Sequence, residues 1–262
     1  MARVLLVVLV ICAVPWTAAA EARRPAPASD PYPLLRGQDT DQVVAAIAEV
    51  QRQGGPRATQ ELIDLLRSGT PDPVTTAALE ALGALGSRDA VDLLSEYAHH
   101  RRPEVRVIAL QSLAGIRDSR VEAVLTNALR DSSPQVRSTA AQALGDGGYT
   151  EAVSVLFQAY ERGVREACAA IGKLGDPDAA DRLAGYLGRG DLQTILEGLG
   201  EFLGRSDFDM DAKLRIVEQL LDLAGPEVRR FLVSQLAEVP NNPRTRALRE
   251  AMEAAIAQIP EE

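Results

Sequence analysis

The sequence predicts an all-α protein, an α-solenoid (superhelix) built from about seven two-helix repeats. Hydrophobic residues make up 46% of the chain but aromatic residues only 4%. This composition favours closely packed helices over a β-sandwich, which would need more aromatic and β-branched residues. The chain is also similar to itself about every 30 residues, which is typical of a repeat architecture.

The first helix of each repeat is marked by a small residue, with an aliphatic residue four positions after it. The pattern is clearest in segments 74–82, 105–113 and 136–144, each of which begins with Val. The small-residue position of the pattern holds alanine in five units and a larger residue in the last two: Ala46, Ala78, Ala109, Ala140, Ala167, Ile195 and Leu232. The aliphatic position follows in step: Val50, Leu82, Leu113, Leu144, Ile171, Leu199 and Leu236. We expect the small side chains to let neighbouring hairpins approach closely.

The second helix of each repeat carries apolar residues at positions i, i+4, i+7 and i+8. In the first unit these are Ala58, Leu62, Leu65 and Leu66, and the pattern recurs within 90–98, 121–129, 152–160 and 179–187. Such spacing places the apolar side chains on one face of an α-helix. Gly, Asp or Ser usually marks the turn between the helices, as in segments 85–89 and 174–177. There we expect Gly to take a left-handed conformation and Asp or Ser to cap the next helix.

The period of the repeat is interrupted in the second half of the chain. Successive small positions lie 27 to 32 residues apart up to Ile195, and 37 residues separate Ile195 from Leu232. The links near Gly163 and Gly190 are therefore short, and the sixth unit gains residues around 205–211. Its second helix resumes at Lys213, Val217, Leu220 and Leu221. Residues 241–259 predict a last helix that caps the array, with five charged side chains facing outward: Arg244, Arg246, Arg249, Glu250 and Glu253.

The N-terminal 20 residues are typical of a cleaved signal peptide. Arg3 supplies a positive start, residues 4–14 form an apolar stretch too short to span a bilayer, and Ala18 and Ala20 mark cleavage before Glu21. An uncleaved anchor is the alternative. A lipoprotein signal fits less well, since the bulky Ile11 precedes the cysteine at position 12. We expect an exported protein, periplasmic or secreted, with a Pro-rich tether at 21–40 and a repeat domain at 41–262.

One motif connects the repeats to a known family. Residues 131–137 read Asp-Ser-Ser-Pro-Gln-Val-Arg and lead into a helix with Ala140, Ala143 and Leu144, and Pro-Glu-Val-Arg occurs at 103–106 and 226–229. These units resemble the HEAT repeat, and they are similar to the short bacterial HEAT-like units named after phycobilisome lyases. The resemblance covers residues 42–259 and is strongest in the middle units. It implies an α-solenoid, a fold that carries many functions.

Histidine and cysteine give weak support for a metal or catalytic site. His99 and His100 are the only histidines. As neighbours at the end of a helix they point in different directions, so we expect structural or solvated roles. Signal cleavage leaves Cys168 as the single cysteine, at a core position of a first helix, where it should behave as a small hydrophobic residue. We therefore expect no disulfide, metal or catalytic thiol.

The insert of the sixth unit offers a weak calcium candidate. Asp207, Asp209, Asp211 and Glu218 partly match an EF-hand loop, but Ala212 replaces the glycine that the loop needs. The favoured interpretation is that these acidic residues cap the second helix of the unit.

The surface lined by the second helices is the predicted protein-binding surface. Phe157 follows the core residue Leu156, where other units carry Ser95 or Thr126. An aromatic side chain exposed there would be a binding hot spot, with Glu96, Asn127 and Gln158 beside it. The alternative is that Phe157 folds into the gap left by the short link at Gly163.

The predicted function is that of an exported, non-catalytic scaffold for a protein or peptide partner, with no cofactor. The net charge of −9 disfavours nucleic acid, and no stable membrane insertion is expected after signal cleavage. No phosphate-loop, zinc-protease or nucleophile-elbow motif occurs. Two alternatives stay open: a HEAT-like enzyme of the bilin-lyase type, and a calcium-responsive module. A resemblance to the HEAT-like di-iron hydroxylases would imply paired His-Glu ligands, which the chain lacks.

Overall fold

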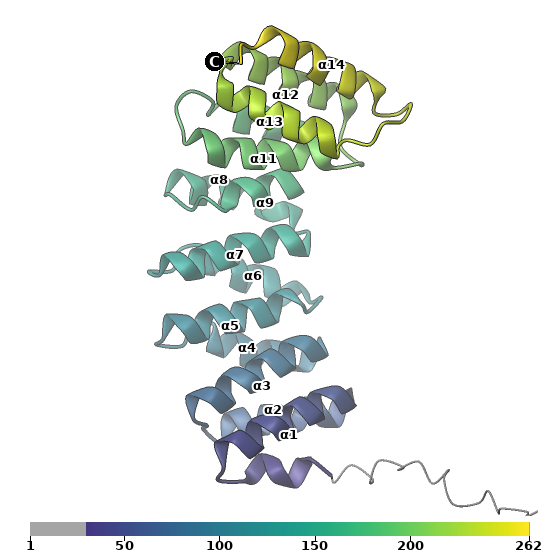
Figure 1. Ribbon diagram of the computed structural model, residues 1–262. Helices are drawn as coiled ribbons and strands as arrows, with labels where there is room; N and C mark the ends of the chain where they lie inside the picture. Colours follow the sequence, from purple (N-terminus) through teal and green to yellow (C-terminus); the bar gives the residue numbers. More distant parts are fainter. Residues whose placement is uncertain (1–29, 262) are drawn as a thin grey trace, which may run out of the picture.

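The computed structural model describes residues 30–261. Within them it contains 14 α-helices, three short 3-10 helices and no strand. The α-helices form seven successive hairpins, which confirms the predicted repeat architecture (Figure 1). The predicted signal peptide, its cleavage site and most of the tether lie outside the described residues.

The odd-numbered helices are the first helices of the seven hairpins. They are α1 (Thr40–Gln53), α3 (Asp72–Leu85), α5 (Pro103–Ala114), α7 (Pro134–Gly147), α9 (Ala167–Leu174), α11 (Leu192–Gly204) and α13 (Pro226–Glu238). The second helices are α2 (Gly55–Arg67), α4 (Val91–Tyr97), α6 (Ser119–Ala128), α8 (Val153–Glu161), α10 (Pro177–Ala184), α12 (Met210–Leu223) and α14 (Arg246–Gln258). The 3-10 helices are η1 (Tyr32–Arg36), η2 (Arg88–Ala90) and η3 (Thr150–Ala152).

The first helices stack on one another in chain order and form one layer of an elongated array (Figure 1). The second helices form the other layer, and from α2 to α10 they pack mainly against the first helix of the following hairpin. The predicted small positions of all seven first helices are buried between the layers, and so are six of the seven aliphatic positions. Only Leu236, in the last unit, is partly exposed. One continuous apolar core therefore runs the length of the array.

The turns within the hairpins follow the predicted capping chemistry with one exception. Gly86 ends α3 in the left-handed conformation, and the Asp176 carboxylate accepts a hydrogen bond from the Ala179 N–H at 2.8 Å. Gly175 was predicted to be left-handed but is extended, with φ −68° and ψ 158°. Because Asp176 caps α10 directly after it, the chain must leave α9 in an extended direction.

Two of the Pro-x-Val-Arg segments place an arginine of the first helical turn, Arg106 or Arg137, so that its guanidinium binds the preceding link. The Arg106 guanidinium is almost fully buried, donates to Asp131 at 2.6 Å and to the His100 carbonyl at 2.9 Å, and so connects two consecutive links. Burial would raise the pKa of Asp131, but hydrogen bonds from Arg106 and the Ser133 N–H outweigh it and hold this pKa below its usual value.

Both ends of the repeat domain differ from the prediction. The tether was predicted to extend to residue 40, but residues 32–36 form η1, which packs on α1 and buries Tyr32 and Leu35. These side chains cover the open end of the array. The proline content of the segment led to the prediction of a tether instead. At the other end, Arg249 does not face outward. It donates to the Leu236 and Val239 carbonyls at 2.8 and 2.7 Å, because the C-terminal carbonyls of α13 need donors.

The closest approach between first helices lies between α9 and α11. A Cβ atom on Gly172 would come within 2.2 Å of the Gly198 carbonyl oxygen, and one on Gly198 within 2.6 Å of the Cys168 carbonyl oxygen. Neither position has room for a side chain, since backbone atoms cannot move aside as a flexible side chain can. Glycine is therefore required at both positions by packing.

We predict that Gly198→Ala lowers the free energy of unfolding by about 1–3 kcal/mol, the usual cost of overpacking. The matched control is Gly204→Ala in the same helix, where a Cβ meets nothing within 4 Å. That change should be neutral or stabilise by up to about 1 kcal/mol, because alanine favours helix more than glycine does. Urea unfolding followed by circular dichroism measures both, and equal effects would contradict the packing argument.

Candidate functional site

The predicted binding residues lie at the same position on three consecutive second helices. Glu96 of α4, Asn127 of α6 and Gln158 of α8 are all exposed. We call this the second-helix surface, defined by these three residues. Asn127 also lines a shallow depression of about 330 Å³ on α6, together with Ser119, Glu122, Ala123 and Thr126.

Phe157 does not belong to the second-helix surface. Its side chain is 1% exposed, so the prediction of an exposed aromatic hot spot is wrong and the alternative, a side chain folded into the gap, describes it. The Arg182 guanidinium lies 3.9 Å from the centroid of the Phe157 ring, and the Tyr186 ring stacks at 6.4 Å. Both covering residues belong to the next hairpin, which the short link after α8 brings over the ring.

Glu161 completes a polar cluster above Phe157. It accepts hydrogen bonds from the Tyr186 hydroxyl at 2.6 Å and from Arg182 at 3.2 Å. These bonds lower the pKa of Glu161, and the same bond to Glu161 raises the pKa of Tyr186. The cluster joins α8 to the hairpin that follows. Tyr186 is the i+7 position of the apolar pattern predicted within 179–187, whereas nothing in the repeat pattern singled out Arg182.

We predict that Phe157→Ala destabilises the chain by about 3–5 kcal/mol, the usual cost of removing a buried phenylalanine. Gln158→Ala, one residue further on the exposed face, should stay within about 0.5 kcal/mol of the parent. Thermal and urea unfolding measure both variants. Unchanged stability of Phe157→Ala would contradict the burial of this side chain.

The insert of the sixth unit does not form a calcium site. Asp207 pairs with Arg205 at 3.0 Å, and the Asp209 carboxylate accepts from the Ala212 N–H at 2.8 Å as the N-cap of α12. Asp211 lies in the first turn of that helix. Residues 30–261 contain no group of three or more His, Cys, Asp or Glu side chains able to hold a metal ion. The capping interpretation is therefore confirmed for Asp209, whereas Asp207 forms an ion pair, and the calcium candidate has no cluster of ligands to support it.

The insert instead anchors itself to the core. Phe208 is buried against Phe202, with ring centroids 4.8 Å apart. Lys213 is also buried, and its ammonium group donates to the Leu203 carbonyl at 2.9 Å and to the Arg205 carbonyl. Burial lowers the pKa of Lys213. In the sequence, Lys213 was identified only as a member of an apolar pattern. Its role as a hydrogen-bond donor to the carbonyls at the end of α11 was not predicted. A depression of about 430 Å³ lies beside the insert, between Phe208 and Val153.

The histidines and Cys168 have structural roles. His99 Nδ1 lies 2.9 Å from the Ser95 carbonyl, and His100 stacks on Tyr97 and accepts from the Arg102 N–H at 3.2 Å. Cys168 is buried, and its burial raises the pKa of the thiol to about 12. A thiol in this state is poorly suited to nucleophilic catalysis.

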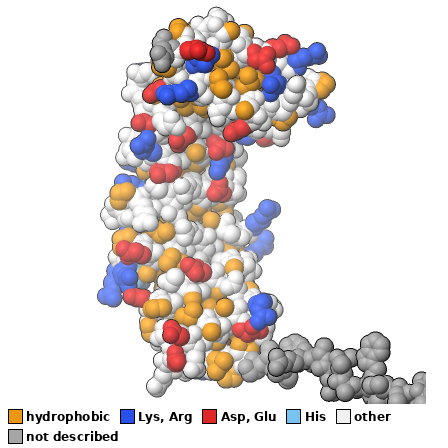
Figure 2. Space-filling view, in the orientation of Figure 1, with side chains coloured by type: hydrophobic (Ala, Val, Ile, Leu, Met, Phe, Trp, Pro, Cys, Tyr) orange, Lys and Arg blue, Asp and Glu red, His pale blue; other side chains and the backbone are white. Residues whose placement is uncertain are grey.

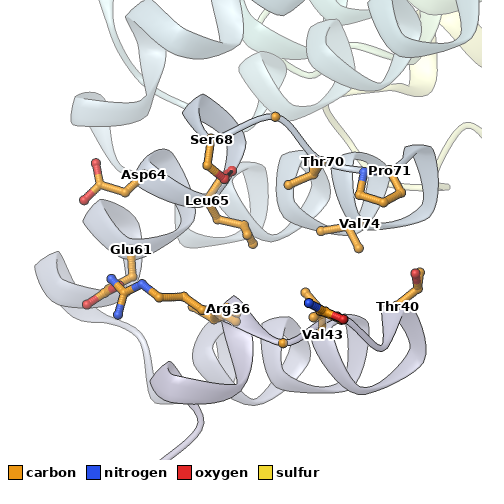
Figure 3. A pocket seen from close by; sticks show the side chains of 14 residues that line it. Arg36, Thr40, Val43, Glu61, Asp64, Leu65, Ser68, Thr70, Pro71 and Val74 are labelled. Atoms are coloured by element: carbon orange, nitrogen blue, oxygen red, sulfur yellow. Dashed lines mark hydrogen bonds and ion pairs between the residues drawn. The ribbon is translucent and has the colours of Figure 1, made fainter.

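A cavity that was not predicted lies at the N-terminal end of the array (Figure 3). It measures about 370 Å³ and is bordered by η1, the start of α1, the outer face of α2 and the link at 68–71. Val43 of α1 and Val74 of α3 line it from opposite sides, while Glu61, which also lines it, pairs with Arg36 at 3.1 Å (Figure 3). The cavity exists because η1 is a single short turn where other units have a whole hairpin. In the sequence, the apolar residues Tyr32 and Leu35 within the Pro-rich segment were the only indication that this segment packs on the array.

Two segments of the chain, residues 32–114 and 95–170, match the family profile of HEAT repeats and together span more than half of its length. The chain belongs to the HEAT repeat family. A comparison with curated proteins gives no match. None of the helices within residues 30–261 of this HEAT repeat protein is long and apolar enough to cross a membrane.

Several solved structures are similar to this HEAT repeat protein. The complex of CpcE and CpcF of phycocyanin lyase, from a Nostoc species, is 21% identical, with a TM-score of 0.50 over 92% of this chain and 99% of that chain. Human deoxyhypusine hydroxylase in complex with glycerol is 18% identical, with a TM-score of 0.42 over 88% and 95%. A designed armadillo repeat protein in complex with the peptide (KR)4 is 15% identical, with a TM-score of 0.39 over 87% and 99%. At 21% identity, the similarity to the CpcE–CpcF complex shows the fold alone and leaves activity open.

Proposed function

We propose that this chain is an exported, non-catalytic scaffold whose second-helix surface binds a protein or peptide partner. The observation that carries the proposal is the repetition of exposed polar side chains, Glu96, Asn127 and Gln158, at one position of three stacked hairpins. A solenoid presents such positions as a continuous surface, which suits an elongated partner. The depression around Asn127 makes part of this surface concave.

The state of the titratable groups supports a non-catalytic role. Catalytic sites usually bring together groups with shifted pKa values in a cleft. Here the lowered pKa of Asp118 arises from hydrogen bonds with Arg120, and that of Asp191 from its hydrogen bonds to Thr194 and its pairing with Arg165. Each of these carboxylates also caps a helix. The shifts are explained by structural contacts, and no reaction is needed to account for them.

We predict that the triple variant Glu96→Lys, Asn127→Lys and Gln158→Lys loses its partner. The three lysines place positive charges and long side chains across the proposed contact surface. The stability of the chain should not change, because all three positions are exposed. Crosslinking in the native host, followed by mass spectrometry, identifies the partners of the parent chain and of each variant.

The matched control is Glu80→Lys, Gln111→Lys and Gln142→Lys. These residues are exposed on the first helices of the same three hairpins, so the control adds the same number of lysines to the opposite layer. The control should keep the partner. Loss in the control with retention in the second-helix variant would refute the proposed surface, and turnover of a substrate by the purified chain would refute the non-catalytic role.

Export is the second part of the proposal and is supported by the sequence alone. We predict that the mature protein begins at Glu21 in a cell-envelope or secreted fraction, as read by mass spectrometry of its N-terminal peptide. Ala18→Glu should block cleavage, because the signal needs small residues at both ends of its Ala-x-Ala site. Ala19→Glu changes the middle position and should be processed normally. Recovery of uncleaved parent chain from the cytosol would overturn export.

A further inference from the structure

A groove of about 550 Å³ lies between α11 and α13, on the side of the first helices. Glu197, Gly200 and Glu201 of α11 form one wall, and Phe231, Gln235 and Glu238 of α13 form the other. Figure 2 shows apolar side chains gathered over α13 with acidic side chains beside them. This groove is separate from the second-helix surface, which lies on the opposite layer of the array.

The groove exists because the last step of the first-helix stack is wider than the one before it. Between α9 and α11, glycines bring backbone against backbone. At Gly200 of α11, by contrast, a Cβ would meet only the ends of the Phe231 and Gln235 side chains, both at 3.3 Å. Side chains therefore separate α11 from α13, and α13 packs less closely on α11 than α11 does on α9. The space between these side chains is open to solvent.

The walls of the groove carry unbalanced negative charge. None of the ion pairs within residues 30–261 involves Glu197, Glu201 or Glu238. Glu197 and Glu201 are one helical turn apart, a spacing at which like charges repel. Arg205 also lines the groove, but its guanidinium donates to the Gly175 carbonyl at 2.6 Å and pairs with Asp207, so three glutamates face one arginine that is already paired. Lys173 of α9 donates to Asp146 at 2.6 Å. A cation that enters the groove would relieve this repulsion.

An aromatic side chain lies between these carboxylates. Phe231 is partly exposed and lines the groove, on the wall opposite Glu197 and Glu201. An arginine side chain matches this combination better than lysine, because its planar guanidinium stacks on an aromatic ring and binds a carboxylate through two parallel hydrogen bonds. Its apolar stem would cover Phe231.

We propose that the α11–α13 groove binds an extended, arginine-containing peptide segment of a partner protein. From Gln193 to Gly204 the wall of α11 is about 16 Å long, at 1.5 Å per residue. An extended peptide advances about 3.3 Å per residue, so about five residues fill the groove. The arginines pair with Glu197 and Glu201 on one wall and with Glu238 on the other.

The test uses a fluorescein-labelled octapeptide of alternating Arg and Ala, with a Glu-Ala peptide of equal length as the reference. Fluorescence anisotropy with the purified chain should show saturable binding of the Arg-Ala peptide, weakened by salt, and none of the reference. In the chain, Glu197→Gln, Glu201→Gln and Glu238→Gln together should weaken binding by roughly tenfold or more.

A charge-matched control separates the groove from general attraction to an acidic protein. Glu80→Gln, Glu227→Gln and Glu250→Gln remove the same charge from exposed glutamates that do not line the groove, and binding should be nearly unchanged. Equal weakening in both triple variants would overturn the proposal, as would failure of the parent chain to bind the Arg-Ala peptide up to about 1 mM.

A steric variant tests the same groove without changing charge. Gly204 lines the groove, and a Cβ there meets nothing within 4 Å, so Gly204→Trp should fold and obstruct the cavity. Gly225→Trp is its control, at another open glycine with an extended φ of 169° outside the groove. We expect Gly204→Trp to abolish binding and Gly225→Trp to retain it. Unchanged binding by a folded Gly204→Trp would overturn the proposal.

Discussion

Close packing of consecutive first helices is the constraint on which the rest of this structure depends. A single hairpin buries only one side of its first helix, so each unit needs the next to cover it. Small residues in the contact allow that approach, and at Gly172 and Gly198 the contact becomes backbone against backbone. Once the first helices are fixed in this way, the positions of the second helices and of the links follow, since both pack on the same continuous core.

Polar groups at the edges of the array hold the stack in register. Arg106 connects two consecutive links through Asp131, Arg205 binds the carbonyls at the end of α9, and Lys213 does the same at the end of α11. Each of these cations satisfies backbone carbonyls that a helix end or a link leaves without partners. Arg205 lines the α11–α13 groove as well, and because it is held by the Gly175 carbonyl and by Asp207, it forms no ion pair with the glutamates of that groove.

Interruptions of the repeat create the distinctive surfaces. The short link after α8 draws the next hairpin over Phe157 and buries it beneath Arg182 and Tyr186. The longer sixth unit places Phe208 in the core and precedes the step at which α13 stands away from α11. At the N-terminus, η1 replaces a hairpin and leaves a cavity beside α1. A uniform array would have none of these features, so the cavities and the α11–α13 groove lie where the period changes, whereas the second-helix surface follows the regular units.

The sequence by itself determined the fold class, the seven hairpins, the buried positions of the first helices and the capping role of Asp209, because each depends on local periodicity or helix-end chemistry. The tertiary structure alone decided which side of α8 Phe157 faces, how Arg249 is used and where cavities form. These features depend on contacts between residues of different hairpins, and a repeat pattern specifies such contacts only while the period is constant. At Gly163 and Arg205 the period changes, and there the distance and angle between neighbouring hairpins, which no local pattern encodes, determine what is buried and what remains open.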